Sequence, residues 1–152
     1  MKRRAGALAY ALALLPTFRR FRGRRVTLDI DGERFERRAL MVIVGNTRLY
    51  GGIAEITHRA RANDGLLDVC VLAGRGPLDL VRRFVSVLRR RHREDDQIDY
   101  RKAGRIVLDP ARPLRLQADG EDIGTTPATF QVYPDALDVI VFPDTPPGFL
   151  GE

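Results

Sequence analysis

The sequence is poor in the residues that several common kinds of protein chemistry require. Its one cysteine, Cys70, excludes an internal disulfide and any cysteine-based zinc site, and it fits a reducing compartment. Its one serine, Ser86, excludes a Ser-His-Asp hydrolase with the usual nucleophile turn. The two histidines, His58 and His92, lie far apart and have no motif around them, so each is interpreted as an ordinary surface or structural residue.

Long apolar runs and nucleotide-binding loops are also missing. No stretch of about 20 apolar residues occurs, so the sequence predicts no membrane-spanning helix. It contains no Walker sequence and no Gly-x-Gly-x-x-Gly turn after an apolar run. The sequence therefore offers no recognisable loop for the phosphates of a nucleotide.

Positive charge is abundant. The 26 Lys and Arg residues exceed the 20 Asp and Glu residues and give a net charge of +6, which favours anionic partners such as lipid head groups, nucleotides or nucleic acid. The basic residues cluster at 2–4, 19–25 and 82–93, although such runs more often form solvated surfaces than binding sites. Aromatic residues make up only 7% and do not interleave with these runs, so a platform for single-stranded nucleic acid is not expected.

The N-terminal segment has two interpretations. A basic start followed by a short apolar run at 5–15 is typical of a signal peptide, but the dense arginines at 19–25 oppose export. Leucines at helical spacing and frequent alanine instead predict an amphipathic helix over 3–15 that ends at Pro16. We therefore expect a cytoplasmic protein.

Short apolar runs separated by Gly, Pro and Asp predict that most of the remaining chain is β-strand. A second helix is expected from Pro77 to about Arg91, with apolar residues on one side and arginines on the other. Together these predict one domain over 1–152, an antiparallel β-sandwich of the α+β class with two helices and a loose tail at 143–152. The predicted strands are 26–30, 35–44, 66–72, 98–102, 105–108, 114–118, 129–133 and 137–142.

Two acidic turns could carry chemistry. Asp64 lies in Asn-Asp-Gly, where turn carbonyls and a carboxylate would suit a hard cation, although Asp-Gly is above all a turn signal. Asp119 and Glu121 flank Gly120, and two carboxylates on one side of an extended chain could supply a general base. A hairpin turn with two solvated acids explains the same residues, and a second Asp-Gly-Glu at 31–33 shows how common that arrangement is.

Several short motifs occur in an order that resembles a known family. They are Val-Gly-Asn at 44–46, Tyr-Gly-Gly at 50–52, Asp-Gly-Leu-Leu-Asp-Val at 64–69, Ala-Asp-Gly-Glu at 118–121 and Tyr-Pro-Asp-Ala-Leu-Asp-Val at 133–139. In this order the chain resembles, over nearly its whole length, the C-terminal domain of the diacylglycerol kinase and sphingosine kinase superfamily, especially bacterial YegS-like lipid kinases.

The resemblance implies a two-domain enzyme that transfers the γ-phosphate of ATP to a lipid hydroxyl. It implies a Mg²⁺ site formed by the carboxylate of Asp64 with backbone oxygens of Arg61 and Leu66, and a proton-accepting acid at Asp119 or Glu121. The lipid could be a diacylglycerol, a sphingoid base or an isoprenoid alcohol. ATP would bind an N-terminal domain through a Gly-Gly-Asp-Gly-Thr motif that this sequence lacks, so we expect the isolated chain to be inactive.

Partners and location follow from the same resemblance. We expect a lipid substrate at the membrane surface, peripheral attachment to the inner membrane, a separate N-terminal kinase domain, and a second copy of the chain as a candidate partner. An alternative is a non-enzymatic basic module that binds anionic lipid or a protein partner through its arginines. Nucleic-acid binding is a third, weaker alternative.

Overall fold

The computed structural model describes residues 21–48, 55–88 and 95–140. The predicted helix at 3–15, the Tyr-Gly-Gly motif at 50–52 and the tail at 143–152 lie outside these residues. Within them, one helix and eight strands form. They are β1 (Arg24–Ile30), β2 (Glu33–Gly45), β3 (Leu67–Ala73), α2 (Pro77–Leu88), β4 (Ile98–Ala103), β5 (Arg105–Pro110), β6 (Arg115–Ala118), β7 (Glu121–Thr125) and β8 (Ala128–Gln131).

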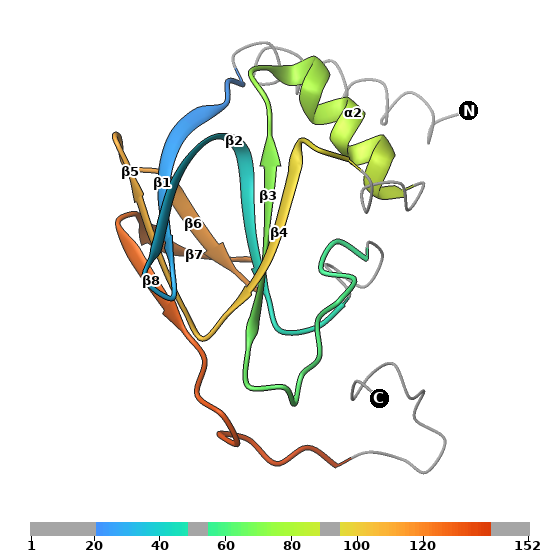
Figure 1. Cartoon of the computed structure of the whole chain (residues 1–152), viewed down its shortest axis with the longest axis vertical. Helices are drawn as coiled ribbons and strands as arrows, with labels where there is room; N and C mark the ends of the chain where they lie inside the picture. The colour runs from blue at the N-terminus through green and yellow to red at the C-terminus, as the bar shows by residue number, and fades with distance from the viewer. Residues whose placement is uncertain (1–20, 49–54, 89–94, 141–152) are drawn as a thin grey trace, which may run out of the picture.

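Six of the strands form one antiparallel sheet in the order β4-β3-β2-β1-β5-β8. The other two, β6 and β7, form a hairpin that lies behind this sheet in Figure 1. Helix α2 follows β3 and lies at the upper right of the same view. The prediction of a mainly antiparallel β-sandwich is confirmed, as is the helix that begins at Pro77.

Strand β3, inside the sheet, is covered on both faces, and its sequence is accordingly an almost continuous apolar run. Its residues 68–72 are all buried, as expected for a strand with neighbours on both faces. Val69 and Val71 join the core between the sheet and the hairpin, which Leu114 and Leu116 complete. Cys70 and the even-numbered residues face the other side, where the second apolar cluster lies.

That second cluster defines the face on which the candidate site lies. It contains Ile43, Cys70 and Leu72 from the sheet and Ile56 from the loop between β2 and β3. The ring of Tyr100 packs against its edge. The loop is therefore fixed to the sheet by an apolar side chain, and the polar residues that follow Ile56 are carried over the ends of β3 and β4.

The two Asp-Gly-Glu tripeptides form equivalent turns. Asp31 and Asp119 have φ angles of 49° and 50°, and the following glycines have φ angles of 91° and 96°. Positive φ at both central residues is the tight hairpin turn that Asp-Gly favours. The carboxylate of Asp31 accepts hydrogen bonds from the backbone N–H groups of Gly104 and Arg105, at 3.1 and 2.8 Å. The first turn therefore ties β1 to the β4–β5 connection.

Two features of the C-terminal half differ from the sequence prediction. The hairpin strand β7 was not predicted, because its residues Glu121–Thr125 are all exposed and lack apolar alternation. Conversely, the predicted strand at 137–142 is wrong for residues 137–140, which form no strand. Leu137 and Ile140 are 80% and 94% exposed, so the alternating pattern there has no neighbouring strand to pair with.

The apolar side of α2 is partly exposed where its side chains are described. Leu78, Val81 and Val85 lie on the side predicted to be apolar, yet they are 62%, 43% and 36% exposed. Among the residues that the structure describes, no helix is long and apolar enough to cross a bilayer.

Cys70 provides a direct test of the doubly covered sheet. Burial, with a smaller contribution from Asp99, raises the pKa of its thiol to about 12. Because the thiolate is the reactive form, we expect almost no modification by a thiol reagent at about pH 8 in the folded chain, and complete modification in denaturant.

The measurement is direct because Cys70 is the only cysteine in the sequence, so every labelled molecule reports this position. Labelling in native buffer as fast as in denaturant would mean that β3 is open to solvent.

Candidate functional site

Three of the five predicted site residues line two cavities, whereas Leu66 and Glu121 line neither of them. Asp64 and Arg61 line a cavity of about 580 Å³. Asp119 lines a larger one of about 1250 Å³. The two cavities share no lining residue. The structure therefore brings Asp64 and Arg61 together and places Asp119 in a separate hollow.

The larger cavity, which we call the acceptor cavity, lies between the large sheet and the β6–β7 hairpin. Its apolar lining includes Ile43, Val44, Leu67 and Phe130. Its polar lining comes from the segments after β2, from β6 and its turn, and from β8: Asn46, Thr47, Thr57, Gln117, Asp119, Thr129 and Gln131. A hollow lined by both apolar and polar groups suits a molecule that has a hydrocarbon part and a polar end.

Asp119 is at the tip of the hairpin, in the turn described above. Its positive φ means that the chain is not extended here, so the sequence-based expectation that Asp119 and Glu121 point the same way from an extended segment is wrong. Glu121 pairs with Ala118 as the first residue of β7. Of the two acids, Asp119 lines the acceptor cavity and Glu121 does not.

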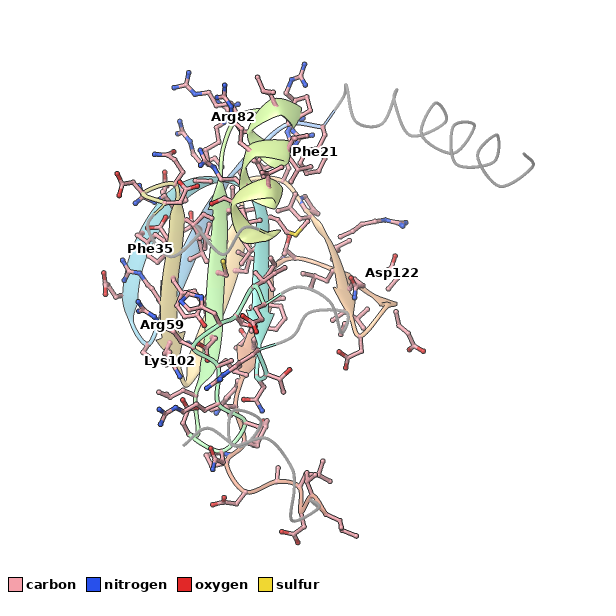
Figure 2. All side chains as sticks on the ribbon, turned by 90° about the vertical axis from the view of Figure 1, so that its right-hand side faces the viewer. Phe21, Phe35, Arg59, Arg82, Lys102 and Asp122 are labelled. Carbon is pink, nitrogen blue, oxygen red and sulfur yellow. The ribbon has the colours of Figure 1, made fainter. Side chains whose placement is uncertain are left out.

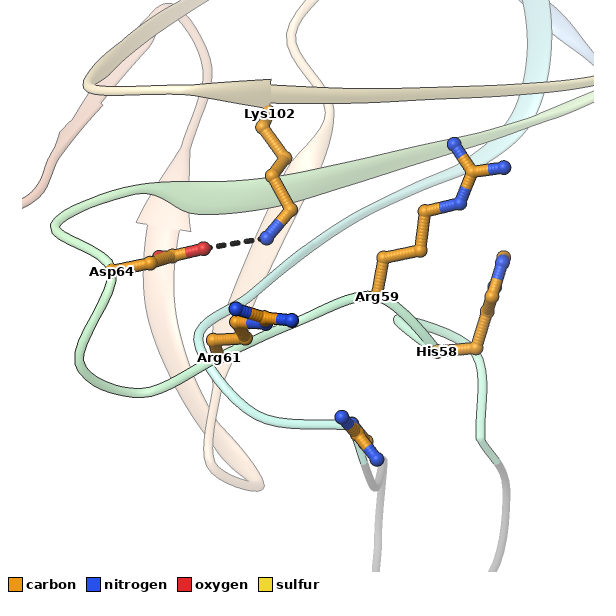
Figure 3. A pocket seen from close by; sticks show the side chains of 6 residues that line it. His58, Arg59, Arg61, Asp64 and Lys102 are labelled. Atoms are coloured by element: carbon orange, nitrogen blue, oxygen red, sulfur yellow. Dashed lines mark hydrogen bonds and ion pairs between the residues drawn. The ribbon is translucent and has the colours of Figure 1, made fainter. Parts of the chain in front are cut away.

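The smaller cavity, which we call the cationic pocket, is bounded by the loop between β2 and β3 and by β4. In Figure 3, Lys102 extends down from β4 and Arg61 extends up from the loop, toward the same space. Arg59 and His58 stand beside them on the same loop. The complete lining is Arg48, His58, Arg59, Arg61, Asp64 and Lys102.

A buried carboxylate lies behind this pocket. Asp68 is 0% exposed and comes from β3. The hydroxyl of Tyr100 donates to its Oδ1, and the Nζ of Lys102 lies 3.5 Å from its Oδ2. Asp68 and Lys102 are direct partners in the β3–β4 ladder, and Tyr100 lies two residues away on the same face. The carboxylate therefore has both a hydrogen bond and a nearby positive charge.

Lys102 also binds the carboxylate of Asp64. Its Nζ lies 2.5 Å from Asp64 Oδ2, while Asp64 Oδ1 accepts the backbone N–H of Leu66 at 3.1 Å. Lys102 therefore lies between two carboxylates, one at the cavity surface and one buried. The turn at 62–65 that presents Asp64 closes with Gly65 at φ 68°, a conformation that favours glycine.

The two carboxyl groups respond to this environment in opposite ways. Burial alone would raise the pKa of Asp64, but Lys102, the Leu66 N–H and the charge of Arg61 together hold it below its usual value. Burial dominates for Asp68 and raises its pKa, with Tyr100 and Lys102 offsetting part of the effect. The surface carboxylate is therefore the more strongly ionised of the two.

The residues around Asp64 do not fit a magnesium ion in this arrangement. Magnesium prefers several oxygen ligands, whereas the pocket supplies one carboxylate, already paired with Lys102, among three arginines. The described residues contain no group of three His, Cys, Asp or Glu side chains that could hold a metal ion. Magnesium held by Asp64 with backbone oxygens of Arg61 and Leu66 stays a prediction, and the ion would have to displace Lys102.

The two cavities are separated by the loop segments that line them. Thr47 and Thr57 line the acceptor cavity, whereas the residues that follow them, Arg48 and His58, line the cationic pocket. The hydroxyl of Thr57 donates to the carbonyl of Thr47 at 2.6 Å. A Cβ on Gly45 would lie 3.0 Å from the Thr57 hydroxyl oxygen, so the close contact of these segments depends on that glycine.

Sequence analysis did not identify Lys102, Tyr100, Arg59 or Arg48 as site residues. They come from β4 and from loops, and their proximity depends on strand register and loop folding. One signal was present: Asp68 interrupts an apolar strand, and a buried acid requires a donor and a cation.

Comparison with known proteins links this arrangement to lipid kinases. A family model described as the YegS C-terminal NAD kinase beta sandwich-like domain matches residues 1–141. The chain is 28% identical over 130 residues to a protein named diacylglycerol kinase from Bacillus subtilis, and 29% identical over 136 residues to one of that name from Mycobacterium tuberculosis. These alignments cover 86% and 89% of the chain but only 43% and 44% of those proteins.

A solved structure agrees with the sequence matches. The chain superposes on a crystal structure of a diacylglycerol kinase from Bacillus anthracis with a TM-score of 0.61 and 25% identity. The superposition covers 80% of this chain and 42% of that one. The chain therefore spans less than half of the length of these relatives.

Replacing Tyr100 by Phe removes the hydroxyl that donates to Asp68 and accepts the Arg59 N–H at 3.0 Å. Because a buried carboxylate loses a hydrogen bond, we expect the free energy of unfolding to fall by about 1–3 kcal/mol, as measured by urea denaturation. Tyr133→Phe is the matched control, since Tyr133 is 73% exposed. Equal stability of the two variants would contradict the role given to Tyr100.

Lys102→Met should destabilise the chain in a pH-dependent way. At pH 7 we expect the free energy of unfolding of Lys102→Met to be about 2 kcal/mol lower than that of the wild type, because two carboxylates lose their cation. The stabilisation linked to the lowered pKa of Asp64 is present at neutral pH and disappears as the pH falls through the carboxyl range. Without Lys102, protonation also relieves the buried Asp68, so the difference between variant and wild type should shrink on acidification.

The control for Lys102→Met is Arg115→Met, which removes a cation from an ion pair whose side chains are 87% and 54% exposed. It should change stability little at any pH. Melting with added Mg²⁺ extends the test, because Mg²⁺ should raise the melting temperature of Lys102→Met more than that of wild type. If the difference in free energy of unfolding between Lys102→Met and wild type stayed constant from pH 7 to pH 3, that would contradict the role given to Lys102.

Proposed function

Because the chain belongs to the YegS C-terminal NAD kinase beta sandwich-like domain family, we propose that it forms the lipid-binding part of a diacylglycerol kinase-type enzyme. The observation that supports this most directly is the acceptor cavity, a hollow with apolar lining in which, of the described residues, Asp119 is the one carboxylate. Its volume of about 1250 Å³ is large enough for the glycerol end and part of the acyl chains of a diacylglycerol.

In this proposal Asp119 acts on the lipid hydroxyl. The hydroxyl oxygen attacks the γ-phosphorus of ATP, its proton passes to the Asp119 carboxylate, and ADP leaves as the bond to the β-phosphate oxygen breaks. Glu121, three positions after Ala118 on the same hairpin, is exposed and lies outside the cavity lining. We therefore assign the proton to Asp119 and give Glu121 no contact with the hydroxyl.

ATP would bind a part of the enzyme that corresponds to the remaining length of the relatives. Magnesium, when bound with ATP, supplies charge neutralisation for the phosphoryl group. The contribution of this chain is to hold the lipid and to orient its hydroxyl at the mouth of the acceptor cavity. That mouth lies beside a cationic surface, which suits a domain working peripherally at an anionic membrane.

The proposal is tested by transplanting this chain into a working enzyme. A chimera in which it replaces the matching part of the Bacillus subtilis diacylglycerol kinase should phosphorylate diacylglycerol. Asp119→Asn in the chimera should lower kcat about 10²- to 10⁴-fold, because proton transfer in the transition state is lost. The readout is radiolabelled phosphatidate formed from labelled ATP.

Asp122→Asn is the control, since Asp122 lies on the same hairpin but is exposed and paired with Arg115 at 3.2 Å. It should leave kcat nearly unchanged.

A dioctanoylglycerol titration of the chain alone, followed by NMR, should shift signals of Val44 and Phe130. An active chimera that tolerated Asp119→Asn would remove Asp119 from the mechanism, and no shift at the cavity would remove the lipid site.

A further inference from the structure

The cationic pocket carries an excess of positive charge that the proposed reaction does not use. Four of its six lining side chains are permanently cationic and one is a carboxylate. That carboxylate, Asp64, is already paired with Lys102, and Lys102 also lies 3.5 Å from the buried Asp68. With both acids ionised, Lys102 and the two carboxylates sum to a charge of −1, so the three arginines leave the pocket and the acid behind it with a net charge of +2.

The three arginines have no carboxylate partner in the described part of the chain. Arg48 donates through Nε to the Ala60 carbonyl at 3.4 Å, and Arg59 lies over the ring of Tyr100 at 5.6 Å. Arg61 is close enough to Asp64 to lower its pKa, but forms no ion pair with it. Three guanidinium groups around one cavity repel one another, the acids offset only part of their charge, and an anion placed between the arginines would relieve that repulsion.

The loop segment that carries Arg59 and Arg61 is also anchored to the sheet at residues 56–59. The backbone N–H of Arg59 donates to the Tyr100 hydroxyl at 3.0 Å, and the ring of His58 packs on the ring of Tyr100 with centroids 4.8 Å apart. Ile56 fixes the start of the same loop in the apolar cluster. Because the loop is fixed to β4 and to the sheet, binding an anion requires little ordering of the backbone.

We propose that the cationic pocket binds a phosphomonoester group. Guanidinium groups match phosphate oxygens with paired hydrogen bonds, and a phosphomonoester carries about 1.5 to 2 negative charges near pH 7. The pocket volume of about 580 Å³ exceeds that of a bare phosphate, so the group can be attached to a larger molecule. Free phosphate and the head group of a phosphorylated lipid share this chemistry.

The pocket lies next to the acceptor cavity, and this position suits a phosphate that is attached to a lipid. The paired segments at Thr47 and Thr57 lie between the pocket and the acceptor cavity. A lipid that has received a phosphate could therefore place its new head group in the pocket while its hydrocarbon part stays near the acceptor cavity. This identification of the lipid rests on the proposed function, whereas the phosphate site itself does not.

The experiment measures binding to the purified full chain, without any kinase assay, so that its failure is distinct from failure of the proposed function. Inorganic phosphate is titrated at constant ionic strength and followed by ³¹P NMR and by melting temperature. A second arm measures co-sedimentation with phosphatidylcholine vesicles that contain phosphatidate, against vesicles of phosphatidylcholine alone.

The test variant is Arg59→Gln with Arg61→Gln. The control, Arg34→Gln with Arg82→Gln, removes two charges from exposed positions outside the pocket. Figure 2 shows Arg82 on α2 at the top of the view, well above Arg59 and Lys102. Losing two charge-assisted contacts should weaken phosphate binding about tenfold or more in the test variant, while the control binds as wild type does.

Each outcome decides the proposal. Binding of phosphate or phosphatidate that the test variant loses and the control keeps supports the pocket, and the arm in which it occurs identifies the free or lipid-bound source. No binding in either arm overturns the proposal. So does an equal loss in both double variants, because that would reflect net charge rather than these arginines.

Discussion

The buried carboxylate of Asp68 is the constraint on which the candidate site depends. At 0% exposure it requires a donor and a cation, and β4 supplies both through Tyr100 and Lys102. That requirement helps to fix the β3–β4 register, because a slip of one residue would turn both side chains to the opposite face of the sheet. Tyr100 in turn accepts the Arg59 N–H, so the same carboxylate indirectly positions the loop that carries the arginines.

The division between the two cavities follows from how tightly two loop segments approach each other. Gly45 leaves room for Thr57, whose hydroxyl bonds to the carbonyl of Thr47. On one side of this contact Thr47 and Thr57 line the acceptor cavity, and on the other side Arg48 and His58 line the cationic pocket. The arginines are thereby kept apart from the apolar lining of the acceptor cavity, in which Asp119 is the one charged lining residue that the structure describes. A ligand with a hydrocarbon part and an anionic head matches this arrangement better than a uniformly polar one does.

Local patterns were sufficient to predict much of the fold. The long apolar runs of β2 and β3, the Asp-Gly turns and the start of α2 at Pro77 all appear in the sequence because they depend on neighbouring residues. The strand β7 was missed because it is exposed on every residue and exists only through pairing with β6. The site was harder to predict, since the meeting of Lys102 with Asp64 depends on contacts between residues 38 positions apart. The resemblance to lipid kinases predicted roles for Asp64, Arg61, Leu66, Asp119 and Glu121. It named Arg61 only for its backbone oxygen, and it named neither Arg48 nor Arg59.

The two Asp-Gly-Glu hairpins show how identical tripeptides acquire different duties. The backbone demands the same first two residues in both, since each aspartate and glycine adopts a left-handed conformation. Asp31 accepts hydrogen bonds from the backbone of Gly104 and Arg105, whereas Asp119 lines the acceptor cavity. Selection for turn geometry alone would preserve both copies in a descendant that had ceased to catalyse anything. An Asp-Gly-Glu tripeptide is therefore evidence of a hairpin turn before it is evidence of catalysis.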